Sequence, residues 1–239
     1  GDKLVAIDDS SITEESTVED GRNLLRGEPG TMVTIAFERE GVNEVQSVTM
    51  PRSIVRLRDV KLATLIGDAK DGIGYIQLSG FTSNAGPEMR QAITYLQQRT
   101  EAATGGENSL QGLVLDLRGN PGGLLTSAVD VASLMVPKGS DIVSARGRGF
   151  PGMLYRSRVD PILESNTKLA VLVNGQTASA AEIVAGAIQD LDVGVIVGAD
   201  RSFGKGLVQN VEELPFNTAL KFTVGKTTKI MCSCAGPRI

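Results

Sequence analysis

The sequence predicts an α/β fold, in which a βαβ core follows a small N-terminal domain. From residue 73 to residue 198, short apolar strands alternate with segments of helical periodicity, the pattern of a sheet covered by helices. Residues 1–52 instead show a strand, a helix and two strands of alternating polarity. We therefore expect one domain over residues 1–52 and a second over residues 53–239.

The elements of the first domain follow from local signals. Gly27 is placed to end a helix, and the segment that begins at Met32 alternates apolar and polar residues as a half-buried strand does. In chain order, the predicted elements are a strand at 4–8, a turn at 10–13, a helix at 16–27, a turn at 28–31 and strands at 32–40 and 45–51.

The second domain is predicted in the same way. Pro87 suits the start of a helix whose buried face carries Met89, Ile93 and Leu96. Further helices are expected from Leu125 and from Ser179. The predicted strands are 73–78, 113–117, 142–145, 169–174 and 193–198, with a hairpin of 206–214 and 219–224 and loops at 104–111, 118–123 and 146–153.

The composition is that of a folded globular protein. Of 239 residues, 41% are hydrophobic and 22% are charged, and the formal net charge is −4. No block of Lys and Arg stands out, so a nucleic-acid partner is not expected. The apolar runs are too short for a membrane-spanning segment.

The absence of histidine limits the chemistry most. With no histidine in the chain, a Ser-His-Asp or Cys-His centre and an imidazole-bearing metal site are both excluded. Cys232 and Cys234 are too few for a disulfide framework or for a zinc site without histidine. A hydrolase of this composition needs Lys, Asp, Glu or an N-terminal amine as its general base. We expect no metal and no cofactor.

Ser179 is a candidate nucleophile because it follows a buried strand and a short turn and opens a helix. The first N–H groups of a helix lack partners, and the helix dipole there favours developing negative charge. The four residues from Ser179 to Glu182 also fit the S-x-x-E capping box, so the hydroxyl alternatively only caps the helix.

Lys205 is a candidate base that lies between Gly204 and Gly206. A lysine in such a segment is ordinarily solvated, and it acts as a base only when burial keeps it neutral. Gln209 would lie on the same side of a strand and could hold the amine, but four residues of strand span roughly 13 Å. The two side chains therefore require a bend at Gly206.

The glycine-rich turn at 118–123 is the third element. After a buried strand, such a turn can direct backbone N–H groups at an oxyanion or a phosphate. Neither G-x-x-x-x-G-K-[ST] nor G-x-G-x-x-G is present, and Ser179 lacks the G-x-S-x-G elbow of α/β-hydrolases.

Taken together, VLDLRGNPGG (114–123), LAVLVNGQTASAAE (169–182) and GADRSFGKGLVQ (198–209) resemble the carboxyl-terminal processing proteases, also called tail-specific proteases. The resemblance covers about residues 1–224, and residues 1–52 resemble most of a PDZ domain. It implies a protease core of the tail-specific type, preceded by a partial PDZ domain.

The resemblance also implies roles at matching positions. Ser179 matches the nucleophile, Lys205 the general base, Gln209 the residue that orients the base, and the backbone N–H groups of Gly123 and Ala180 the oxyanion hole. The implied activity is a serine endopeptidase that cleaves protein tails near the C-terminus through an acyl-enzyme and needs no cofactor. Members of the family work in the bacterial periplasm or the chloroplast thylakoid lumen.

Two departures leave alternatives open. The tail-binding strand and carboxylate loop of a PDZ domain are not found before residue 4, and the sequence after about residue 224 does not match the family. The main alternative is a catalytically inactive PDZ and protease-like module that binds protein tails. A third is acyl chemistry on small molecules such as CoA thioesters, in which Lys205 would have no role.

Overall fold

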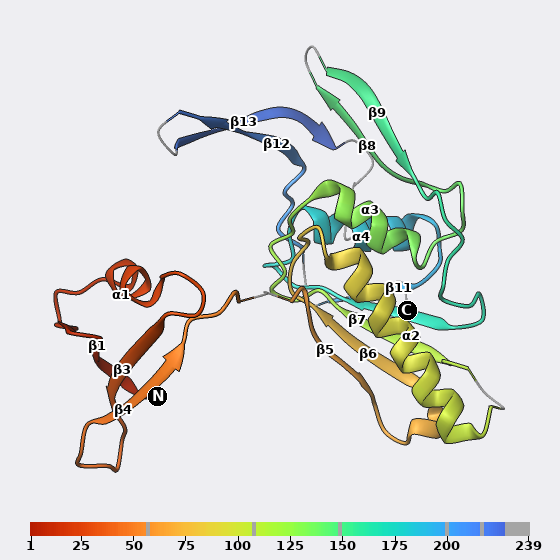
Figure 1. The fold of residues 1–239 in the computed structure, drawn as a ribbon. Helices are drawn as coiled ribbons and strands as arrows, with labels where there is room; N and C mark the ends of the chain where they lie inside the picture. The colour runs from red at the N-terminus through yellow and green to blue at the C-terminus, as the bar shows by residue number, and fades with distance from the viewer. Residues whose placement is uncertain (56–57, 107–108, 148–149, 199–200, 216–217, 228–239) are drawn as a thin grey trace. The chain divides into compact units, whose positions relative to one another are not determined.

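The structure is a computed structural model that describes residues 1–55, 58–106, 109–147, 150–198, 201–215 and 218–227. The chain divides into two compact units, Gly1–Leu57 and Arg58–Ile239, and each is described by itself (Figure 1). The predicted departure from the family after residue 224 falls largely on residues 228–239, which lie outside the described residues, as do Cys232 and Cys234.

The first unit is a four-stranded antiparallel sheet of order β2-β1-β3-β4 with one helix. Helix α1 begins with a capping box, in which Asp20 N–H donates to Thr17 Oγ1 and Thr17 N–H donates to the Asp20 carboxylate. Ile7 and Val33 form its buried centre. The elements are β1 (Lys3–Ile7), β2 (Ser10–Ser11), α1 (Val18–Leu25), β3 (Met32–Glu38) and β4 (Gln46–Pro51).

The predicted strands and helix of this unit are confirmed, with a helix shorter than expected. The turn predicted at 10–13 is partly wrong, because Ser10 and Ser11 pair with β1 as a short strand. A two-residue strand carries too little pattern to be seen in a sequence.

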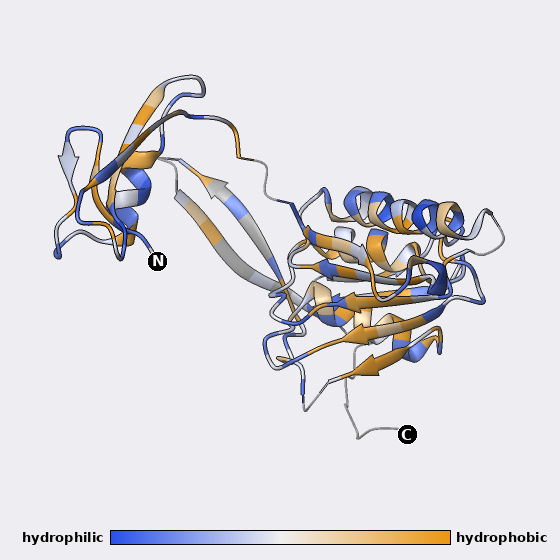
Figure 2. Cartoon of the chain, turned by 90° about the horizontal axis from the view of Figure 1, so that it is seen from below, coloured by the Kyte–Doolittle hydropathy of each residue, from blue (hydrophilic) through white to orange (hydrophobic). Residues whose placement is uncertain are grey.

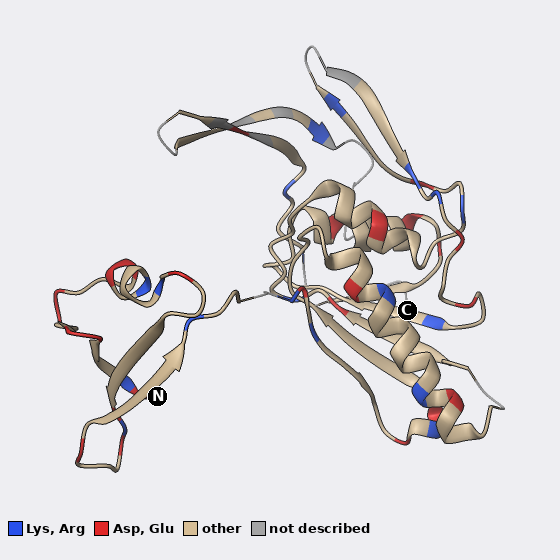
Figure 3. Ribbon diagram, in the orientation of Figure 1, with Lys and Arg blue, Asp and Glu red and all other residues tan. Residues whose placement is uncertain are grey.

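The second unit is built on a five-stranded sheet of order β11-β10-β7-β6-β5. Its strands β6, β7, β10 and β11 are parallel, and β5 pairs with β6 in the antiparallel sense. Figure 2 shows these strands as largely hydrophobic, as expected for a sheet covered by helices, and Figure 3 shows few charges on them. The strands are β5 (Val60–Leu65), β6 (Ile73–Leu78), β7 (Gly112–Asp116), β10 (Lys168–Leu172) and β11 (Val195–Val197), with a 3₁₀ turn η1 (Ala69–Asp71) before β6.

Three helices cover this sheet: α2 (Ala85–Thr104), α3 (Leu125–Ser133) and α4 (Ala180–Asp190). Contacts join α2 to α3 and α3 to α4, so the helices form one layer, as Figure 1 shows. Met89, Ile93 and Leu96 are fully buried, which confirms the helical face predicted from their spacing. The α/β class predicted from the sequence is confirmed.

A third sheet has the order β12-β13-β8-β9 and is antiparallel throughout. The predicted hairpin around Pro215 is confirmed as β12 and β13. Its strands are β8 (Asp141–Gly147), β9 (Phe150–Arg156), β12 (Leu207–Leu214) and β13 (Thr218–Thr227).

The flexible loop predicted at 146–153 is wrong, because β8 and β9 pair through most of this segment. Proline interrupts most strands because it has no N–H group to donate. Pro151 lies in β9, which is an edge strand, where proline is tolerated. The sequence also gave no expectation for β5, whose six residues pair with β6. Among the described residues, no helix has the length and apolarity needed to cross a bilayer.

Candidate active site

Two turns meet at one edge of the central sheet. Strands β7 and β10 are parallel neighbours, so the turns after Asp116 and after Leu172 leave the sheet at the same edge. The buried Asn120 joins them: its carbonyl accepts the N–H of Ala178 at 2.9 Å, and its amide donates to the carbonyl of Leu78 at 2.8 Å. The carboxyl ends of parallel strands are the usual place for a site in α/β proteins.

Glycine is required where these turns touch. A Cβ atom on Gly122 would lie 2.8 Å from the backbone nitrogen of Ala180 and 2.8 Å from Cβ of Ser179. A Cβ atom on Gly123 would overlap the carbonyl oxygen of Phe81. The 118–123 turn therefore packs closely against the residues that open α4, beside Ser179.

Ser179 has a strained backbone. Its φ is 55° and its ψ is −115°, the conformation of the first central residue of a type II′ turn, where glycine is preferred. The N–H of Ala181 closes this turn on the carbonyl of Ala178 at 3.2 Å. A non-glycine residue held in such a region is often found at a functional site.

Glu182 connects the start of α4 to the glycine-rich segment that precedes β12. Its side chain is 3% exposed. The Oε2 atom accepts the N–H of Ser179 at 2.7 Å and the N–H of Lys205 at 2.9 Å. The Oε1 atom accepts the hydroxyl of Ser202 at 2.6 Å and the N–H of Gly204 at 2.6 Å. The Glu182 side of the predicted capping box, its contact with the N–H of Ser179, is confirmed, and Glu182 also contacts residues beyond the helix start.

The structure brings Ser179 and Lys205 together through their backbones. Both N–H groups donate to Oε2 of Glu182, at 2.7 Å and 2.9 Å. The distance between the two backbone nitrogens therefore cannot exceed the sum of these two hydrogen-bond lengths. The N–H of Phe203 also donates to the carbonyl of Thr177 at 2.9 Å. The segment around Lys205 is thus held against the turn that carries Ser179.

The side chain of Lys205 is exposed, which differs from the burial that its proposed chemistry led us to expect. Gly204, with φ of +82°, turns the chain before it. Gln209 is exposed on β12 next to a register shift at Val208. Within the part of the chain that the structure describes, no hydrogen bond joins Lys205 to Gln209.

The backbone N–H groups of Gly123 and Ala180 donate no hydrogen bond to any acceptor among the described residues. Ala180 is the first residue of α4, and Gly123 follows the glycine that packs against it. Backbone N–H groups without an acceptor, at a helix start and in a glycine-rich turn, are donors that an anionic oxygen can use.

A buried acid braces the first turn. Asp116 accepts hydrogen bonds from the Arg118 guanidinium and from the Tyr75 hydroxyl, the latter at 2.7 Å. Burial alone would raise the pKa of Asp116, but the hydrogen bonds from Arg118 and Tyr75 and the Arg118 charge hold that pKa below its usual value. The same contacts raise the pKa of Arg118, while burial and Asp116 raise the pKa of Tyr75.

Sequence reasoning missed the wider role of Glu182 and the brace formed by Asp116. The signal for Glu182 was a lone acid in the otherwise apolar helix AAEIVAGAI, since an acid is rarely buried without partners. For Asp116, the signal was an acid that ends a buried strand two residues before an arginine. The described residues contain no group of three or more Cys, His, Asp or Glu side chains that could hold a metal ion.

Comparison with known proteins gives a consistent result. The model of peptidase family S41 matches residues 72–231. The chain is 37% identical over 223 residues to a carboxy-terminal-processing protease of Bartonella bacilliformis, covering 93% of this chain and 48% of that protein. It is 33% identical over 227 residues to a carboxyl-terminal-processing protease of Synechocystis, covering 94% and 49%.

Solved structures agree in fold. The chain matches a photosystem II D1 C-terminal processing protease with a TM-score of 0.58 and 33% identity, over 96% of this chain and 58% of that one. The chain spans about half the length of the curated relatives it matches.

The strain at Ser179 predicts an unusual order of stability. Ser179→Gly should unfold with a free energy about 1 kcal/mol greater than that of Ser179→Ala, because glycine adopts this φ without strain. Both variants lack the hydroxyl, so urea unfolding of the pair isolates the backbone effect. Equal stability, or a more stable alanine variant, would show that the turn is relaxed.

The four hydrogen bonds of Glu182 predict a costly amide substitution. Glu182→Gln places an NH₂ group against two donors, so we expect a loss of about 2–3 kcal/mol in the free energy of unfolding. Glu88→Gln is the matched control, since Glu88 accepts one N–H, from Val60, and glutamine keeps an acceptor for it. Similar losses in both variants would contradict the proposed network.

The brace at Asp116 predicts a loss of stability in acid. A carboxyl whose pKa is lowered by folding stabilises the protein above its unfolded pKa of about 3.9, and that contribution is lost as the pH falls through the folded value. The stability gap between wild type and Asp116→Asn in urea should therefore be widest near neutral pH and narrow below about pH 4. A gap that is constant from pH 7 to pH 3 would rule out this contribution.

Proposed function

Because the chain belongs to peptidase family S41, we propose that it is a serine endopeptidase that cleaves protein substrates near their C-terminus through an acyl-enzyme. The relatives named as carboxyl-terminal processing proteases support this activity. The observation that carries it is the single carboxylate oxygen of Glu182, which accepts the backbone N–H groups of both Ser179 and Lys205.

In the proposed reaction, the Ser179 oxygen attacks the carbonyl carbon of a peptide bond while neutral Lys205 takes the hydroxyl proton. The new C–O bond gives a tetrahedral oxyanion. When the C–N bond breaks, Lys205 returns the proton to the leaving amine, and an acyl-enzyme remains. Water, deprotonated by Lys205, then attacks the ester and releases the acid and the Ser179 hydroxyl.

We assign the oxyanion hole to the backbone N–H groups of Gly123 and Ala180. Neither group has an acceptor among the described residues. The backbone of Gly122 packs closely against Ser179 and Ala180. Donors fixed in place by glycine packing cost no rearrangement when the charge develops. The strained turn at Ser179 serves the same purpose by holding its oxygen at the end of the helix.

Lys205 needs cover to act as a base. Removal from water favours the neutral form of an amine, and Lys205 is exposed in the structure. We propose that the bound peptide supplies this cover, and that Gln209 then accepts a hydrogen bond from the amine. The bulge at Val208 and the glycine at 206 allow the bend that this contact requires.

We further propose the domain division of the sequence, a partial PDZ domain over 1–52 and a protease core over 53–239. In this assignment, the sheet of the first unit binds a protein tail by strand addition. In this sheet, β2 and β4 are edge strands, and each has one neighbouring strand. The outer side of an edge strand presents backbone groups that a further strand can pair with.

The proposal predicts selective labelling of one serine. A fluorophosphonate probe should modify Ser179, as read by mass spectrometry of the digested protein, because an active site activates one hydroxyl above all others. Lys205→Ala should slow labelling by roughly 100-fold or more, since the general base is lost. Lys61→Ala, which removes an exposed lysine on β5, is the control and should label as wild type does.

Absent labelling of the folded wild type, with Lys205→Ala indistinguishable from it, would overturn the catalytic assignment and leave a tail-binding module. Labelling that does not depend on Lys205 would retain the nucleophile but reject the base.

A further inference from the structure

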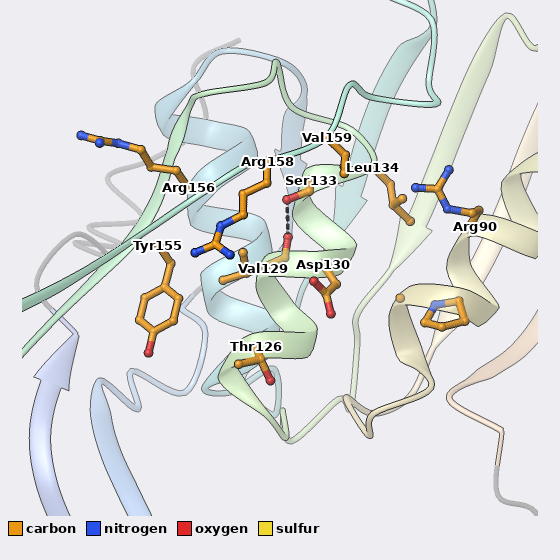
Figure 4. Close-up of a pocket in the computed structure, with 12 residues that line it drawn as sticks. Arg90, Thr126, Val129, Asp130, Ser133, Leu134, Tyr155, Arg156, Arg158 and Val159 are labelled. Atoms are coloured by element: carbon orange, nitrogen blue, oxygen red, sulfur yellow. Dashed lines mark hydrogen bonds between the residues drawn. The ribbon is translucent and has the colours of Figure 1, made fainter.

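A pocket of about 490 Å³ lies on the helical layer, and Ser179 is not among the residues that line it. It is formed by the first turns of α2, the length of α3, and the end of β9 with the residues that follow it. Three arginines line it, Arg90, Arg156 and Arg158, against a single acid, Asp130 (Figure 4). None of these residues has a role in the proposed reaction.

Two of the three guanidinium groups are available. Arg156 pairs with Asp141 at 2.6 Å, and in Figure 4 its side chain points away from the other two. Arg90 and Arg158 form no ion pair or hydrogen bond with any residue that the structure describes. Figure 4 shows them on opposite sides of Asp130. An open pair of guanidinium groups is suited to carboxylates, which it binds in a bidentate manner.

The remaining wall is apolar and aromatic. Val129, Leu134 and Val159 line the pocket together with the ring of Tyr155. The hydroxyl of Ser133 is already occupied, since it donates to the carbonyl of Val129 at 2.7 Å. A ligand therefore meets apolar surface between two positive groups, which suits side chains that carry methylene groups as well as charge.

We propose that this pocket is an exosite for an acidic peptide segment of the substrate, with carboxylates at Arg90 and Arg158. A single compact anion that reached both guanidinium groups would lie against Asp130. Separate carboxylates on an extended chain can contact each arginine and avoid that acid. Charge complementarity of this kind adds specificity to a protein contact.

The position of the pocket relates it to the reaction, and this step rests on the proposed function. Thr126, on its rim, stands three residues after Gly123. Asp130 is five residues after Leu125, the first residue of α3, so it lies roughly 8 Å along the helix from the end that follows Gly123. Because an extended peptide rises about 3.3 Å per residue, the exosite selects acidic residues that begin about three positions from the cleaved bond.

The test is binding of two fluorescein-labelled decapeptides to the full 239-residue chain carrying Ser179→Ala, measured by fluorescence anisotropy. One peptide has two glutamates three residues apart, and the other has glutamines there. We expect the glutamate peptide to bind about fivefold more tightly at low salt, and the difference to vanish near 1 M salt.

Variants then locate the site. Arg90→Gln and Arg158→Gln should each remove most of the preference, whereas Asp130→Asn should tighten glutamate binding about twofold by removing the opposing charge. Arg99→Gln is the matched control, since Arg99 is an exposed arginine on α2, the helix that carries Arg90, and it does not line the pocket. Equal binding of the two peptides, or an equal loss in Arg99→Gln, would overturn the exosite.

The two proposals fail separately. If Ser179 does not react with the fluorophosphonate but the glutamate preference depends on Arg90 and Arg158, the peptidase assignment fails and the acidic-peptide site stands. If Ser179 reacts and the peptides bind equally, the exosite alone fails. In an active wild type, Arg158→Gln should raise KM for the glutamate peptide with kcat unchanged, which a folding defect would not do.

Discussion

A buried carboxylate with four hydrogen-bond donors holds the candidate active site together. Glu182 accepts N–H groups from Ser179, Gly204 and Lys205 and the hydroxyl of Ser202. It therefore joins the first turn of α4 to a segment more than twenty residues later in the chain. A buried acid without these donors would be costly, so the two segments stabilise each other's position. The site depends on this one group for its geometry.

Around that carboxylate, close backbone packing and hydrogen bonds hold the turns of the candidate site in position. Gly122 and Gly123 let the turn after β7 touch the start of α4 and the chain at Phe81, and Asn120 fixes that turn to two neighbouring segments. Ser179 occupies a backbone conformation that favours glycine, which the surrounding bonds impose. Among the described residues, the N–H groups of Gly123 and Ala180 have no acceptor, and the oxyanion hole we propose uses these two donors.

Much of this architecture could be predicted from local pattern. The strands and helices of the core have strong periodicity, and the absence of histidine limited the base to few residue types. Edge strands were missed or misread, as at 146–153, because their pairing is decided by partners distant in sequence. The same is true of Glu182. Its spacing from Ser179 is visible in the sequence, but its contacts with Gly204 and Lys205 arise only when the chain folds.

The exposure of Lys205 is the point at which the structure most constrains the mechanism. The segment that carries this residue is fixed against Ser179, while its amine is open to water. The account therefore requires a peptide to complete the site. The direct measurement is a crystal structure of the chain with a peptidyl boronate bonded to the Ser179 oxygen. We predict that the Lys205 amine will lie within hydrogen-bonding distance of that oxygen, with the peptide covering it. An amine that remains in solvent, pointing away from Ser179 in the occupied site, would contradict the account.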